Sequence, residues 1–210
     1  IESLNSLAQY SRQFGDGQTS LFIYDASTRP NTNNTLNIRD LPVLDSLDAV
    51  EQAVNATDET NTTSIIMFLK AIPATITIAE GVTVGDGSLW DLLHDPCWES
   101  EDLLDPDCVG WTAVPLSERQ ALRKDMVNVA FDTLSDEVRS TLMNEDGTKA
   151  IVYVRQRYMN LNVAGELRDE IDDILEEGPT LLNTRTSLLT GGLPVSLDIN
   201  DGIHDTQATT

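Results

Sequence analysis

The fold is decided by residues 144–157, NEDGTKAIVYVRQR, which join a turn signal to an alternating run. Asp146-Gly147 is typical of a tight hairpin turn, because both positions tolerate the backbone angles that such a turn needs. In the run that follows, side chains alternate between two faces, with Ala150, Val152 and Val154 on one and Ile151, Tyr153 and Arg155 on the other. Residues 138–159 are therefore predicted to form a β-hairpin, with a strand on each side of the turn.

Helices are predicted on both sides of this hairpin. After it, apolar residues recur at helical spacing over residues 163–177, and Gly178-Pro179 ends the pattern. Before it, Ser117 and Gln120 have the spacing of a capping box. These signals predict one helix over Val163–Glu177 and another that begins near Ser117.

The N-terminal half predicts a strand, a helix and a second strand. The compact apolar run TSLFIYD indicates a strand over Thr19–Asp25. Asp40 can cap a helix that runs to Asn55, since Pro42 is tolerated in the first turn and apolar residues recur at helical spacing. The apolar run SIIMFLKAI indicates a buried strand over Ser64–Lys70.

A last strand and an amphipathic exit segment are predicted within residues 186–207, which completes the order strand, helix, strand, insertion, strand, helix, strand. Without the insertion this is the split βαβ (ferredoxin-like) pattern of an α+β fold, in which two helices cover one face of a four-stranded antiparallel sheet. We expect one domain over residues 1–210. Within it, residues 72–115 form an irregular insertion that holds both cysteines and all three tryptophans.

The charge of the chain limits its partners. It has 35 Asp and Glu against 13 Lys and Arg, a formal net charge of -22, and the acids are spread along the whole chain. Such a surface repels nucleic acid, so no nucleic-acid partner is expected. It suits a salt-adapted organism, since salt shortens the Debye length to roughly 3 Å at 1 M. The sequence contains no apolar run of 18 or more residues that could span a bilayer.

Two features favour a compartment outside the cytoplasm. Cys97 and Cys108 lie in one short acidic segment, and a disulfide between them is the preferred interpretation, with two free thiols or a metal site shared with His94 as alternatives. Three N-x-[ST] triplets provide candidate glycosylation sites, at Asn33, Asn55 and Asn61. The first residues have neither the basic start nor the apolar core of a signal peptide, so we expect an excised extracellular segment.

Enzyme motifs are absent from the sequence. It contains no H-E-x-x-H, no G-x-S-x-G, no P-loop and no G-x-G-x-x-G pattern. Paired carboxylates carry no weight in so acidic a chain. We therefore expect neither catalysis nor a cofactor or metal ion.

Three segments together resemble the first extracytoplasmic loop of exporters of the resistance-nodulation-division (RND) superfamily, in the hydrophobe-exporter branch. They are the strand TSLFIYD with the helix after it, the hairpin NEDGTKAIVYVRQR with the helix NVAGELRDEIDDILEE, and the ending TGGLPVSLDINDGIHDTQ. The resemblance covers most of the chain and leaves the Cys- and Trp-containing insertion unplaced.

The resemblance implies a non-catalytic porter segment at the extracellular face of the cell membrane, in a multi-pass parent protein. Its implied partners are the membrane domain and second porter loop of the same transporter, and hydrophobic or amphiphilic small molecules, with a homo-oligomer as a further candidate. Four aromatic residues are candidates for a substrate groove, although packing of the insertion onto the core is the preferred explanation for them: Phe68, Trp90, Trp98 and Trp111. The alternative function is an archaeal cell-surface binding or adhesion module, with a secreted hydrolase third.

Overall fold

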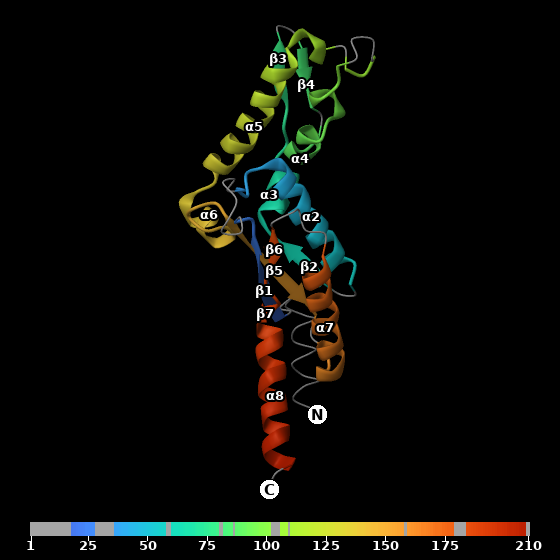
Figure 1. The fold of residues 1–210 in the computed structure, drawn as a ribbon, viewed down its shortest axis with the longest axis vertical. Helices are drawn as coiled ribbons and strands as arrows, with labels where there is room; N and C mark the ends of the chain where they lie inside the picture. Colours follow the sequence, from blue (N-terminus) through green and yellow to red (C-terminus); the bar gives the residue numbers. More distant parts are fainter. Residues whose placement is uncertain are drawn as a thin grey trace.

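The computed structural model describes residues 18–27, 36–57, 60–79, 82–85, 87–101, 106–108, 110–157, 159–178 and 184–208. Within these ranges the protein is a mixed α+β fold with seven α-helices and two small antiparallel sheets (Figure 1). In chain order the elements are β1 (Gln18–Asp25), α2 (Leu41–Asn55), β2 (Thr60–Thr63), α3 (Ile65–Ala71), β3 (Ile76–Ala79), β4 (Val82–Val84), α4 (Leu89–Leu93), the short 3-10 helices η1 (Pro96–Trp98) and η2 (Trp111–Ala113), α5 (Leu116–Thr133), α6 (Asp136–Leu142), β5 (Lys149–Gln156), α7 (Leu161–Glu177), β6 (Arg185–Thr186), β7 (Thr190–Gly191) and α8 (Gly192–Ala208).

The main sheet has the strand order β2-β5-β1-β6, with β7 also paired to β1, and every pair is antiparallel. β1 and β5 pair along their whole length, so that Leu21 lies opposite Tyr153 and Ile23 opposite Ile151. The alternation predicted for β5 is confirmed, because Ala150, Val152 and Val154 are fully buried while Arg155 is exposed. Two strands far apart in the sequence thus form the centre of the fold.

Helices α2 and α7 lie on the same side of the main sheet and contact one another (Figure 1). Both were predicted, and each buries one apolar stripe. Asn160 caps α7, since its side chain accepts a hydrogen bond from the Val163 amide at 3.0 Å. The core between these helices and the sheet includes Phe22, Tyr24, Val43, Leu47, Val50, Val54, Val152, Val154, Leu167, Ile171 and Leu175.

A second, smaller core lies at the end of the molecule opposite α8 (Figure 1). It is built by Leu92, Cys97, Trp98, Cys108 and Trp111, with residues of β3, β4 and α5 packed around them. We call this part, from β3 to the first half of α5, the distal lobe, and the remainder the main lobe. The range 72–115, expected to be irregular, therefore contains a hairpin and a short helix around a core of its own. Helix α5 joins the lobes, since Leu122 contacts the distal core and Phe131 is buried in the main one.

Two predicted strands are helices instead. Residues Ser64–Lys70 were expected to form a strand, but Ser64 caps α3 by accepting a hydrogen bond from the Ile66 amide at 3.0 Å, and the apolar residues of α3 bury on one helical face. The first arm of the predicted hairpin forms α6, capped by Ser135, and only Met143 pairs with β5, at Ala150. In both segments a local cap and a one-sided apolar face favour the helix over the strand.

Two helix ends also differ from the sequence prediction. Helix α5 begins at Leu116 with Pro115 at its N-cap position, so the Ser117 and Gln120 pair does not cap it. At the C-terminal end, the exit segment forms α8 directly after β7, where Gly191 has a φ of 105° that favours glycine. None of the helices in the described ranges is both long and apolar enough to cross a bilayer.

Candidate functional site

The four aromatic residues proposed for a substrate groove fall into two pairs. Trp98 and Trp111 are 0% and 2% exposed, and their rings meet edge to face with centroids 4.4 Å apart. The indole nitrogen of Trp98 donates to the Leu92 carbonyl at 2.6 Å. Phe68 and Trp90 are half-buried and pack against the main core. The burial of Trp98 and Trp111 fits the packing alternative, and leaves Phe68 and Trp90 as the partly accessible members of the group.

Trp90 belongs to a group of side chains that fastens the distal lobe to helix α2, and we call this group the clasp: Asp45, Asp48, Lys70, Trp90 and His94. The centroids of the His94 and Trp90 rings lie 4.4 Å apart. The Lys70 ammonium lies 5.2 Å from the centroid of the Trp90 ring, which is a cation–π contact. Lys70 pairs with Asp48 at 2.6 Å, and the Nε2 atom of His94 lies 2.6 Å from Asp45 Oδ1. Two carboxylates of α2 thus bind Lys70 of α3 and His94 at the end of α4.

His94 is hydrogen-bonded through both ring nitrogens. Its Nδ1 atom lies 2.7 Å from the Trp90 carbonyl oxygen, and its Nε2 atom contacts the Asp45 carboxylate. His94 thus connects the backbone of α4 to the Asp45 side chain of α2.

The disulfide between Cys97 and Cys108 lies in the distal core, with Cα atoms 5.3 Å apart. Arg119 of α5 is only 4% exposed and holds the same loop, because its guanidinium donates to the carbonyls of Cys97 and of Ser100, the latter at 2.9 Å. Both thiols are consumed in the bond, and within the described ranges no group of three or more His, Cys, Asp and Glu side chains is arranged to hold a metal ion. The cysteines, Arg119 and the tryptophans form one structural unit.

The three candidate glycosylation sites have different environments. Asn33 lies outside the described residues. Asn55, at the end of α2, uses its amide twice, donating to Thr62 Oγ1 at 2.8 Å and accepting from the Thr62 amide at 2.7 Å. Asn61 is exposed on β2, where it pairs with Arg155. Of the two that the structure places, Asn61 presents the more accessible amide.

Glu51 is a buried carboxylate that the sequence analysis did not single out. It lies on the inner face of α2, is 6% exposed, and accepts hydrogen bonds from Ser64 Oγ and, at 3.0 Å, from Thr62 Oγ1. Burial raises the pKa of Glu51 and Asp48 adds to the rise, against the lowering effect of the two hydroxyls and of Lys70, so that the pKa lies at about 7. The burial of Glu51 could have been predicted from the sequence, because Glu51 follows Leu47 by four residues and therefore lies in the apolar stripe of the helix.

A cleft opens between the lobes beside the first turn of α2 and the middle of α5. It combines cations with apolar side chains and three acids: Arg39, Asp40, Leu41, Pro42, Asp45, Glu99, Gln120, Arg123, Lys124 and Val127. Arg39 pairs with Asp132 at 2.8 Å, and Arg123 binds the Leu93 carbonyl at 2.7 Å and Glu99 at 2.9 Å. In a chain with a net charge of -22, a cleft that balances its charges differs from the rest of the surface. We call it the junction cleft.

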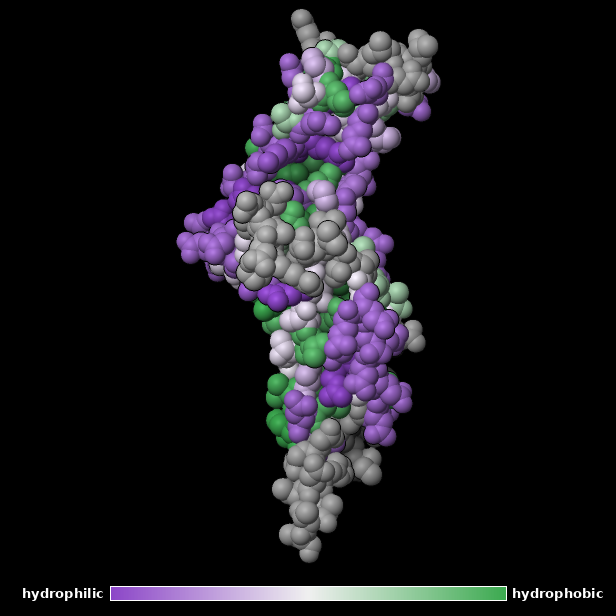
Figure 2. Space-filling view, in the orientation of Figure 1, coloured by the Kyte–Doolittle hydropathy of each residue, from purple (hydrophilic) through white to green (hydrophobic). Residues whose placement is uncertain are grey.

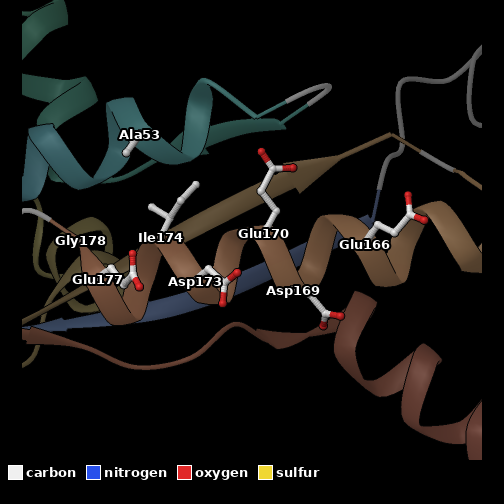
Figure 3. A pocket seen from close by; sticks show the side chains of 8 residues that line it. All are labelled: Ala53, Glu166, Asp169, Glu170, Asp173, Ile174, Glu177 and Gly178. Atoms are coloured by element: carbon white, nitrogen blue, oxygen red, sulfur yellow. The ribbon is translucent and has the colours of Figure 1, made fainter.

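A second hollow runs along the outer side of α7 and is acidic (Figure 3). Its lining comprises Ala53, Glu166, Asp169, Glu170, Asp173, Ile174, Glu177 and Gly178. Figure 3 shows the five carboxylates spread along the helix and pointing in different directions, without converging on one point. This is the geometry of a solvated helix face, where dissolved cations screen the charges.

Comparison of the chain with protein-family models, with curated proteins and with solved structures finds no match. We therefore infer the function from the strand order, the two-lobed architecture, the junction cleft and the clasp.

Proposed function

We propose that this chain is the extracytoplasmic porter portion of an exporter of the RND superfamily, with a split βαβ core. The observation that carries the proposal is the strand order β2-β5-β1-β6 with antiparallel pairs throughout. In chain order these are the second, third, first and fourth strands of the main sheet when β7 is left aside, which is the order of the split βαβ pattern. The helices α2 and α7 are the two crossovers, and both lie on one side of the sheet.

In this proposal the junction cleft is part of the substrate pathway. Its apolar residues Leu41, Pro42 and Val127 suit the body of a hydrophobic or amphiphilic molecule, and Arg39, Arg123 and Lys124 suit a polar or anionic end. The chain itself is non-catalytic. It acts by offering a passage and by contact with the membrane domain and second porter loop of the parent transporter, at the extracellular face of the membrane.

The clasp supports a moving part at this position. It links α4 to α2 by polar and aromatic contacts, beside the apolar packing of Leu89 and Leu93 into the main core, and polar contacts exchange for water more readily than apolar ones do. A porter must change the width of its passage during each cycle. Opening the clasp would widen the junction cleft, because Asp45 belongs to both.

A cell-surface binding or adhesion module is the second candidate. It is favoured by the exposed sequon at Asn61 and by the disulfide between Cys97 and Cys108, both suited to an oxidising exterior. The two candidates differ in the parent protein. An exporter requires a membrane helix just before residue 1, about five closely spaced helices after residue 210 and a second loop like this one, whereas a surface module has a single anchor or none.

The proposal is tested by narrowing the cleft in the full-length transporter. Gln120 lines the junction cleft on α5, and its neighbour Ala121 is exposed and does not line it. We expect Gln120→Trp to lower efflux of a panel of fluorescent amphiphiles several-fold, while Ala121→Trp, the matched control, leaves efflux unchanged. Equal efflux for both variants at equal expression would exclude the cleft from the pathway, and a parent protein without multiple membrane helices would overturn the exporter proposal itself.

A further inference from the structure

We propose that the uncovered face of the main sheet is the contact surface of a homodimer, in which two copies of this chain pack sheet against sheet. The proposal goes beyond the porter function and does not depend on it. We call this surface the open face. It is the side of the sheet opposite α2 and α7.

The pairing register defines which side chains belong to the open face. Residues paired across antiparallel strands project to the same side, so Leu21 with Tyr153 and Ile23 with Ile151 mark its centre. Thr190 pairs with Leu21, and Leu188 projects to the same side because Leu189, between them, is buried towards α7, where its amide donates to Asp172. The open face comprises Thr19, Leu21, Ile23, Asp25, Asn61, Thr63, Lys149, Ile151, Tyr153, Arg155, Arg185, Leu188 and Thr190.

The open face has an apolar and partly exposed centre. Ile23 is 38% exposed and Leu188 is 51% exposed, and Leu21, Ile151 and Tyr153 are half-buried, whereas the neighbouring residues on the helix-covered side are buried. Helix α6 borders the face at one margin, since the Tyr153 hydroxyl donates to the Thr141 carbonyl at 3.0 Å. A sheet face with large side chains left in water is a recurring sign of an interaction surface.

The apolar surface continues onto helix α8. Leu193 and Leu197 are buried against the main lobe, while Val195 and Ile199, one turn apart, are 52% and 59% exposed. In Figure 2 the hydrophobic colour gathers along the side of the molecule formed by the lower part of the sheet and the start of α8. The open face and this side of α8 together form a larger apolar surface.

Charge sets the open face apart from the rest of the protein. The chain carries 35 acidic residues, yet the open face includes one carboxylate, Asp25, which is 6% exposed and pairs with Lys149 and Arg185 at one end of the sheet. Two copies with a net charge of -22 each repel one another, and they do so least where carboxylates are fewest at the contact. The open face is therefore the surface through which this chain can meet itself.

The size of the surface suits a weak dimer. β1 and β5 have eight residues each, so at roughly 3.4 Å per residue and about 4.8 Å between strands the two central strands measure about 27 by 10 Å, and the shorter outer strands bring the sheet to roughly 400 Å². The exposed side of α8 adds to this area, and each copy stays below the roughly 800 Å² that a standard interface buries, as expected of a weak dimer. A second sheet is also the partner whose shape fits a sheet, since two sheets pack face to face at about 10 Å.

The test is sedimentation equilibrium of the purified chain over a concentration series, in about 0.2 M and about 2 M KCl. We expect the apparent mass to rise from 23.1 kDa towards twice that value with concentration, and the dimer to be at least tenfold tighter at the higher salt, where repulsion is screened. A chain that stays monomeric at every concentration in both salts overturns the proposal, whatever other molecule covers the face.

Matched variants locate the contact. Ile23→Glu and Leu188→Glu each place a carboxylate on the open face and should weaken the dimer at least tenfold in 2 M KCl. Val129→Glu makes a comparable change at a position on α5 that is 60% exposed and away from the face, and should leave the dimer intact. Circular dichroism verifies that each variant is folded. A folded Leu188→Glu variant that dimerises like the native chain, or a Val129→Glu variant that loses dimerisation equally, overturns the proposed surface.

Discussion

Replacing Glu51 with glutamine should remove a pH dependence from the stability of this protein. Burial raises the pKa of Glu51 from its ordinary value of 4.5 to about 7 in the folded chain, with Ser64 and Thr62 donating hydrogen bonds to its two oxygens. The folded state therefore holds the proton more tightly than the unfolded state. The stability contributed by this proton is complete below pH 4.5 and is lost as the pH rises through about 7.

The expected size follows from the two pKa values. A rise from 4.5 to about 7 in the folded state corresponds to about 3 kcal/mol in total, of which about 2.5 kcal/mol is lost between pH 5 and pH 8. The range begins at pH 5 because the isoelectric point of the chain is near 4.1. In Glu51→Gln this loss is absent, so the stability of the variant relative to the native chain should increase by about 2.5 kcal/mol across the same range.

Urea unfolding followed by tryptophan fluorescence, at fixed 2 M salt and at each pH unit from 5 to 8, measures this difference. Subtracting the native curve from that of the variant cancels the titration of the other carboxylates. The control is Glu118→Gln, the same chemical change at an exposed position of α5. A difference for Glu51→Gln that stays constant within about 0.5 kcal/mol from pH 5 to pH 8 would refute the reasoning.

Three further predictions concern the distal lobe, a turn and helix α7. Cys97→Ser opens the disulfide loop and should destabilise the distal lobe by about 2–3 kcal/mol. The near-ultraviolet circular dichroism of Trp98 and Trp111 should then be lost at a lower urea concentration than in the native chain. An unchanged urea midpoint for that signal would contradict a stabilising role of the bond. Gly147→Ala should cost about 1–2 kcal/mol, because Gly147 has a φ of 67° and an added Cβ would lie 2.8 Å from the Asn37 amide nitrogen. Gly165→Ala, inside α7, should instead stabilise the protein by about 0.5–1 kcal/mol, because nothing lies within 4 Å of the added Cβ. Thermal unfolding of both glycine variants measures the two changes. A shift of the melting temperature in the same direction for both would contradict these predictions.

The periodic elements were predictable because each buries one regular face. The alternation in β5 and the apolar stripes of α2 and α7 are visible in the sequence, since one side of each element meets the core. Their order along the chain then indicated the α+β class. The hairpin predicted over residues 138–159 was wrong in its first strand, because the residues before the turn form α6.

Short apolar segments and long-range contacts were not predictable in this way. Residues Ile65–Ala71 are apolar almost throughout, so they show no period, and the helix there depends on the Ser64 cap and on which residues meet the core. The distal core brings together Trp98, Trp111 and Leu122, which are far enough apart in the sequence that no periodic pattern predicts their contact. The uncovered sheet face likewise required the register of β1 with β5, because the sequence alone does not say which side the helices occupy.

Helix α5 has a mechanical consequence for a protein built from two lobes. It has 18 residues, so it is a rod of about 27 Å, stiff over this length because its hydrogen bonds are internal. Its first half is anchored in one hydrophobic core and its second half in the other. A tilt of about 10° at the main-lobe end would displace the far end by roughly 5 Å, as a lever does. A small change in the packing around Phe131 would therefore produce a larger displacement of the distal lobe.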